Sequence, residues 1–221
     1  MHFRKRSTLA ITTMVALGGV PSVARADLLG SGGTVIGPTM TLYFGGTLLA
    51  SLSGPLSPPG FIGSGVTAVV RNTSGTLDFY YQLSTLAGGR DGPNRITGFD
   101  YDSYLTDVFQ IANGSAIGAG FVNGSIASLS ADRALSGATV GFNFSNALFT
   151  PGQTSLAFVI RTNATSFTSG NFGAIDGGGA TLAGFAPTGP VATVPEPSTT
   201  VLLGTGLLGL AGYVRRRKRY A

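Results

Sequence analysis

Four aspartates in the middle of the chain come closest to a recognisable chemistry. They are Asp91, Asp100, Asp102 and Asp107. Carboxylate oxygens at close spacing could hold Ca²⁺, which takes about six to eight oxygen ligands. The order Asp-x-Asp-x-Asp-Gly of an EF-hand loop is absent, and Arg90 and Arg95 lie nearby. The favoured interpretation is therefore a solvated acidic surface, partly paired with these arginines, and calcium is the weaker alternative.

Side chains that support other catalytic chemistry are scarce. The chain has no Cys, its one histidine is His2, and its two lysines are Lys5 and Lys218. Residues between these ends therefore have no imidazole, thiol or amine for a catalytic triad, a Schiff base or a zinc site. A glycosidase needs two carboxyl groups about 5 to 10 Å apart, and the one glutamate is Glu196, near the C-terminus. We predict no enzymatic activity and no cofactor.

Aromatic side chains gather in the same part of the chain as the aspartates. They are Phe79, Tyr80, Tyr81, Phe99, Tyr101 and Tyr104. Surface tyrosines can stack on sugar rings, which would suit a carbohydrate ligand. The alternative places every other aromatic ring of a strand in the core. A lectin-like module that binds carbohydrate or calcium is thus the second functional hypothesis.

The N-terminal residues 1–26 have the three parts of a secretory signal peptide. Basic residues 4–6 precede an apolar run over 9–20, and Ala24 and Ala26 form a small-x-small cleavage site before Asp27. An uncleaved anchor is less favoured, because this apolar run is shorter than the roughly 18 residues of a spanning helix. We expect a helical signal segment, export through the Sec translocon, and a mature chain that begins at Asp27.

The C-terminal residues 195–221 form a second tripartite segment. Pro195, Glu196 and Pro197 should be extended, because proline fixes its own φ and moves the preceding residue out of the helical region. An apolar helix over 199–214 would reach about 24 Å, a marginal transmembrane span. Five cations follow as a cytoplasmic stop signal over 215–219: Arg215, Arg216, Arg217, Lys218 and Arg219.

This tail resembles the sorting signal of PEP-CTERM proteins, the exosortase substrates of Gram-negative bacteria. The resemblance implies that Pro195, Glu196 and Pro197 are recognised by the exosortase and that cleavage falls close to them. It also implies a transient inner-membrane precursor with its body in the periplasm, which is then delivered to the cell surface or released. We expect a structural role in an exopolysaccharide or biofilm context, with exopolysaccharide as a candidate partner.

The positive charge of the protein lies in its two basic ends, residues 4–25 and 215–219. The full chain carries +5, but five arginines and nine acidic residues remain between the basic ends, a net charge of −4. Binding to nucleic acid needs a clustered basic surface that neutralises phosphates. The central chain lacks the cations for such a surface, so we predict no nucleic-acid partner.

Residues 27–185 are expected to position all of these groups as one domain. They are rich in Gly, Ser, Thr, Val and Phe, and apolar residues alternate with polar ones in short segments, which favours strands joined by tight turns. Residues 66–71 and 76–83, with Asn, Ser and Gly between them, predict a hairpin. We predict a single antiparallel β-sandwich of about seven to nine strands, without disulfides, followed by a flexible linker over 186–194.

Overall fold

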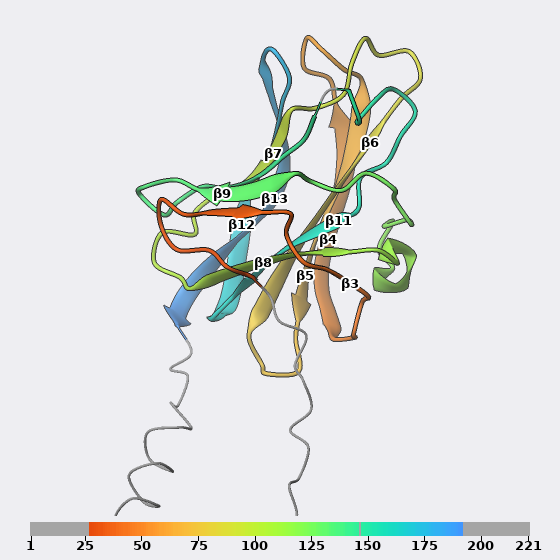
Figure 1. Cartoon of the computed structure of the whole chain (residues 1–221). Coiled ribbons are helices and arrows are strands. Elements are labelled where there is room, and N and C mark those ends of the chain that lie inside the picture. The colour runs from red at the N-terminus through yellow and green to blue at the C-terminus, as the bar shows by residue number, and fades with distance from the viewer. Residues whose placement is uncertain (1–26, 146, 192–221) are drawn as a thin grey trace, which may run out of the picture.

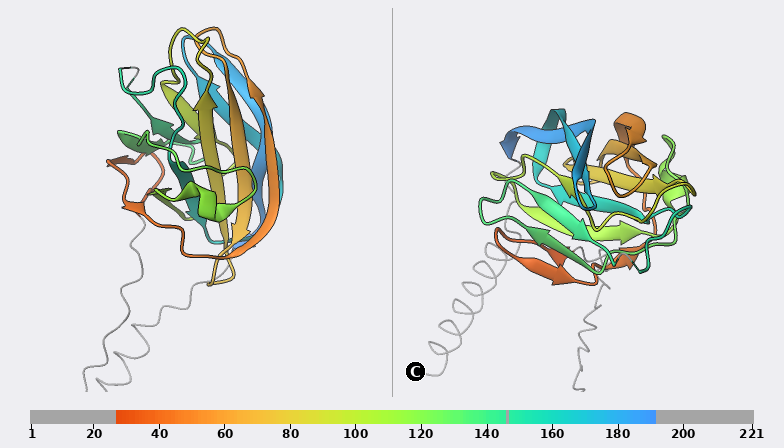
Figure 2. Two further views of the ribbon diagram at one scale, coloured as in Figure 1. Left: turned by 90° about the vertical axis from the view of Figure 1, so that its right-hand side faces the viewer. Right: turned by 90° about the horizontal axis from the view of Figure 1, so that it is seen from above.

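The computed structural model of the protein describes residues 27–145 and 147–191, and these form two β-sheets packed face to face. One sheet has seven strands and the other six (Figure 1). A 3₁₀ turn, η1 (Gly114–Ile117), lies at one side of the sandwich (Figure 2). The predicted all-β sandwich is confirmed. Its strands are more numerous than the seven to nine expected, because several have only two to four residues and leave little pattern.

The seven-stranded sheet carries the charged residues of the candidate site described below. Its order is β1-β8-β11-β6-β5-β4, with β3 also beside β8. The bounds are β1 (Asp27–Leu28), β3 (Met40–Thr41), β4 (Thr47–Leu56), β5 (Gly63–Arg71), β6 (Leu77–Thr85), β8 (Thr106–Ile111) and β11 (Ala157–Thr162). Neighbours are antiparallel except β3 and β8, which are parallel.

The six-stranded sheet is antiparallel throughout and has the order β13-β12-β7-β10-β9-β2. Its strands are β2 (Thr34–Ile36), β7 (Arg95–Gly98), β9 (Ser130–Arg133), β10 (Val140–Asn143), β12 (Ala164–Ile175) and β13 (Gly179–Val191). The β12–β13 hairpin is the longest among the described residues, and β13 lies at one edge of this sheet.

The predicted hairpin over 66–83 is present as β5 and β6. Asn72 shapes its turn, because the Oδ1 atom accepts hydrogen bonds from the backbone N–H groups of Ser74 at 3.0 Å and Thr76 at 3.2 Å. Gly75 adopts a φ of 84°, a left-handed conformation that glycine reaches without a steric penalty. The Asn-Thr-Ser-Gly sequence therefore acts through its side chain and its glycine, as the turn rules predict.

Strand β6 is buried on both faces, unlike the half-buried strand that simple alternation predicts. Phe79 and Tyr81 join the core between the sheets, while Tyr80 points to the opposite face and is also fully buried. That opposite face is covered by Tyr43 and by Phe121, from the segments before β4 and after η1. The seven-stranded sheet thus has a second, smaller apolar cluster on its outer side.

The end of the sandwich differs from the predicted domain boundary. Strand β13 continues to Val191, so residues 186–191 of the expected linker belong to this strand; residues 186–188 and 191 pair with β12, and the register is irregular between them. Pro187 and Pro190 are compatible with this strand because it is a sheet edge, where a missing N–H leaves no ladder partner unsatisfied. The signal segment 1–26, the linker residues 192–194 and the helix 199–214 lie outside the described residues. No helix in the described part is long and apolar enough to cross a membrane.

Candidate functional site

The four aspartates proposed for calcium do not share a site. Asp91 precedes β7, Asp100 and Asp102 lie in the loop between β7 and β8, and Asp107 is in β8 of the other sheet. Among the described residues, no group of three or more His, Cys, Asp or Glu side chains is placed to hold a metal ion. These aspartates are close in the sequence but not all close in space, because the chain crosses from the six-stranded to the seven-stranded sheet between β7 and β8.

Arg95 was expected to pair with this acidic segment, but it pairs elsewhere. Its guanidinium forms a two-point contact with Asp132 on β9, with Nη2 donating to Oδ1 at 2.6 Å. Asn143 of the intervening strand β10 also donates to Asp132 at 2.6 Å. The hydrogen bonds from Arg95 hold the pKa of Asp132 below its usual value. This group stabilises the outer face of the six-stranded sheet.

The tyrosines that suggested carbohydrate stacking are mostly inside the protein. Tyr80, Tyr81 and Tyr101 are at most 1% exposed, and Phe79 is fully buried. The hydroxyl groups of Tyr81 and Tyr101 form a hydrogen bond of 2.6 Å between the sheets, and burial raises the pKa of both phenols. Tyr104 remains half-buried. These rings form core contacts, so the aromatic cluster as a whole is not a sugar-binding surface.

An ion pair on the outer face of the seven-stranded sheet is the main charged group that the sequence did not predict. Asp78 on β6 and Arg161 on β11 are directly opposite in the antiparallel register. Arg161 donates from Nε to Oδ1 at 3.0 Å and from Nη2 to Oδ2 at 2.9 Å. Asn72 adds a further hydrogen bond to Asp78 at 2.8 Å. The carboxylate is therefore satisfied although its side chain is only 1% exposed.

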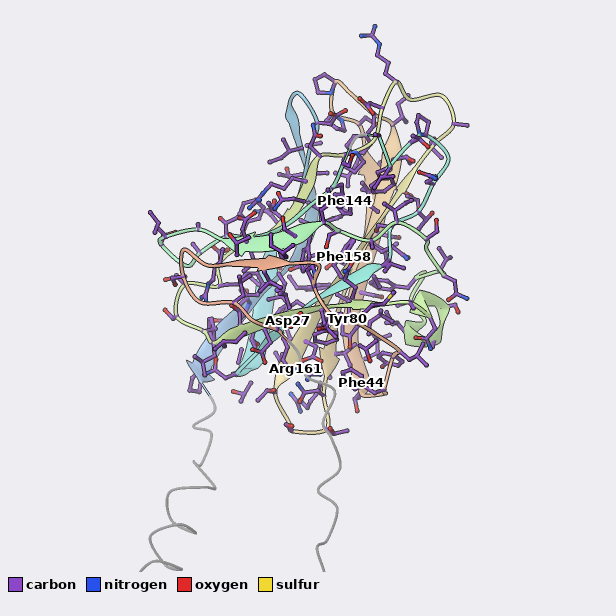
Figure 3. All side chains as sticks on the ribbon, in the orientation of Figure 1. Asp27, Phe44, Tyr80, Phe144, Phe158 and Arg161 are labelled. Atoms are coloured by element: carbon purple, nitrogen blue, oxygen red, sulfur yellow. The ribbon has the colours of Figure 1, made fainter. Side chains whose placement is uncertain are left out.

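Aromatic rings enclose the Arg161 guanidinium. Its central carbon lies 5.0 Å from the ring centroids of both Phe44 and Phe109, within the range of a cation–π interaction. Figure 3 shows Phe44, Tyr80 and Arg161 in the same part of the sandwich. Burial alone would lower the pKa of Arg161, but the hydrogen bonds and charge of Asp78 outweigh it, and the pKa is raised. Arg161 is a permanent cation held by a buried anion.

A surface pocket of about 250 Å³ opens beside this ion pair. It is lined by Ser74, Thr76, Leu105, Asp107, Arg161, Thr162 and Asn163. Burial raises the pKa of Asp107, although the nearby Arg161 opposes this shift. The walls offer hydroxyl, amide and aliphatic groups, while Arg161 is already engaged by Asp78. The pocket therefore offers hydroxyl, amide, carboxylate and aliphatic groups to a ligand or partner.

A second buried arginine organises the loops at the same end of the sandwich. Arg133 is 6% exposed and, within the described chain, takes part in neither of the two ion pairs. Its guanidinium donates to backbone carbonyl oxygens of Leu29, Tyr101, Tyr104 and Gly137. Burial lowers the pKa of Arg133. It joins three loops, and no local signal in the sequence separates it from an exposed arginine.

Comparison with known proteins identifies the C-terminal segment. Residues 193–218 match the family model of the PEP-CTERM protein-sorting motif. Pro195, Glu196, Pro197 and the cations Arg215 to Lys218 fall within this match, whereas Arg219 and the signal-peptide residues Ala24 and Ala26 do not. No curated protein and no solved structure matches the chain. The chain carries a PEP-CTERM sorting motif, which marks an exported protein that is processed by an exosortase and sorted to the cell envelope.

Proposed function

We propose that this protein is a non-enzymatic structural component of the cell surface or extracellular matrix, delivered by its sorting motif. The match over residues 193–218 carries the proposal, because it joins the body to a dedicated export and processing route. The body contributes a sandwich whose buried ion pair and tyrosine pair serve packing. The body presents hydroxyl, amide and apolar groups on its surface, which suits contacts with other molecules.

The proposed route begins with Sec-dependent export and removal of residues 1–26. The precursor is then held in the inner membrane by residues 199–214 and 215–219, with the body in the periplasm. The exosortase cleaves near Pro195 to Pro197 and releases the body or transfers it to an acceptor. An exopolysaccharide context for the delivered protein follows from the resemblance of the tail alone and belongs to this proposal.

Replacing all three motif residues, Pro195, Glu196 and Pro197, by alanine tests the route in the full-length protein. We expect the variant to accumulate as precursor in the membrane fraction, while the parent chain is shortened and leaves it. The control is Ser51→Ala, because Ser51 is exposed on β4 and lies outside residues 193–218, so this variant should be processed normally. Equal processing of the triple variant and the parent would contradict the proposal.

The alternative is a secreted module that binds carbohydrate or calcium. The burial of Tyr80, Tyr81 and Tyr101 and the separation of the aspartates reduce its support. Calorimetric titration of the mature protein with CaCl₂ and with the polysaccharide of the producing organism distinguishes the two. Saturable heat with either ligand would favour the binding module over a purely structural role.

A further inference from the structure

The sorting motif begins almost directly at the end of the folded body. Strand β13 ends at Val191, whose Cα is paired with that of Ala164 in β12. Three residues, 192–194, separate Val191 from Pro195. A fully extended chain covers at most about 3.6 Å per residue, so Pro195 lies within about 14 Å of Val191. Of the short flexible linker expected over 186–194, residues 186–191 belong to β13, and three residues separate this strand from the motif.

The C-terminal end of β13 forms side-chain hydrogen bonds with neighbouring segments. Tyr104 donates its hydroxyl to the carbonyl oxygen of Gly189 at 3.1 Å, and Thr165 donates to that of Pro190 at 3.2 Å. These contacts come from two different elements, the loop before β8 and strand β12. The end of β13, from which the tail continues, is thus held in place. We call this end the root of the tail, and movement of it would add little to the distance between the body and Pro195.

The surface around this root has exposed apolar side chains and the pocket beside Arg161. We call it the exit surface and define it by Leu28, Ser74, Leu105, Asn163 and Pro190. Leu105 is 60% exposed, and its backbone N–H donates to Asn163, the residue before Ala164, at 3.0 Å. Leu28 is 71% exposed and pairs with Asp107, which lines the pocket. The first and last described residues, Asp27 and Val191, lie at the same end of the sandwich (Figure 1).

We propose that the exit surface is a contact site for the exosortase during processing, with Leu105 beside the pocket as its apolar centre. This inference rests on the proposed function. An enzyme whose cleft holds residues 195–197 must come within about 14 Å of Val191, so its outer face meets this end of the body. Exposed apolar side chains gathered beside a pocket are a feature of surfaces that contact another protein. The sandwich then contributes to recognition together with the short motif.

The test measures the rate of processing of the full-length protein expressed with its exosortase, by pulse labelling. Leu105→Asp places a charge in the proposed contact and should slow conversion of precursor to product about tenfold, which corresponds to about 1.4 kcal/mol of lost contact free energy. The matched control is Leu86→Asp, since Leu86 is 55% exposed and follows the opposite end of β6. It should be processed at the parental rate.

A second pair of chains separates contact from misfolding. Inserting about 20 Gly and Ser residues after Val191 moves the body away from the cleft, so Leu105→Asp should then have no effect relative to the same insertion alone. Leu105→Ser, a milder change, should give an intermediate rate with an unchanged thermal midpoint. If the parent is processed and Leu105→Asp matches Leu86→Asp, the contact is refuted while the proposed function stands. If the parent is not processed, the proposed function itself is contradicted.

Discussion

Removing Arg161 should destabilise the protein by leaving a buried carboxylate without its counter-ion. The Asp78 side chain is 1% exposed and that of Arg161 is 20% exposed, so the pair is largely desolvated. Breaking such a pair from one side costs about 3 to 5 kcal/mol. Loss of the contacts with Phe44 and Phe109 adds about 1 kcal/mol. We therefore expect Arg161→Met to lower the free energy of unfolding by at least about 3 kcal/mol.

Urea unfolding of the mature protein, followed by circular dichroism, measures this change. The control is Arg71→Met, because Arg71 is exposed at the end of β5 and should matter by less than about 0.5 kcal/mol. The double variant Asp78→Leu with Arg161→Met removes both charges and should recover most of the loss, since an apolar pair avoids the desolvation penalty. A cost below about 1 kcal/mol for Arg161→Met, or simple additivity in the double variant, would refute this reasoning.

Three further predictions follow from the same contacts. Arg133→Met should cost about 3 kcal/mol in urea unfolding, because buried loop carbonyls lose their donors, and a cost like that of an exposed arginine would contradict this. The pKa of Asp132 is lowered, so its carboxylate stabilises the protein above about pH 4, and this stabilisation disappears as the pH falls through the pKa of the folded state. The difference in urea midpoint between the parent and Asp132→Asn should therefore close at low pH. A difference that does not change with pH would contradict an ionic contribution from Asp132. Gly92→Ala should lower the thermal midpoint strongly because its Cβ would lie 1.8 Å from the Phe149 carbonyl oxygen, whereas Gly88→Ala has open space, and equal midpoints would contradict the packing.

The sequence was sufficient for the fold class and for the one hairpin that it predicted, over residues 66–83. The alternation over 66–71 and 76–83 and the Asn72 turn are local signals, and they survive in β5 and β6 because these strands are neighbours in the chain. Strand β13 was only partly predicted. Its second half contains Gly189 and Pro190, which favour a linker by composition. It continues as a strand because β12 pairs with it up to Thr188 and again at Val191, with an irregularity of the register between them.

The charged groups were harder to predict because their partners are distant in the sequence. Asp78 and Arg161 meet across β6 and β11, although 83 positions separate them. Each interrupts an otherwise apolar strand, and this was the available signal of a paired charge. Asp91 and Asp107 show the converse, since they are close in sequence, yet Asp91 precedes β7 of one sheet and Asp107 lies in β8 of the other. In both cases the position of the charged side chain depends on which strands pair in the folded protein, and no local sequence pattern specifies that pairing.

The most direct test of the central claim is intact-mass analysis of this protein from membrane, surface and secreted fractions of cells that contain the exosortase. We predict a mature form that begins at Asp27 and ends close to Pro195, without residues 199–221, outside the inner membrane. Cells without the exosortase should retain the species that still carries residues 199–221. If the protein outside the inner membrane carries the intact tail, or if loss of the exosortase changes nothing, processing through the PEP-CTERM motif is contradicted.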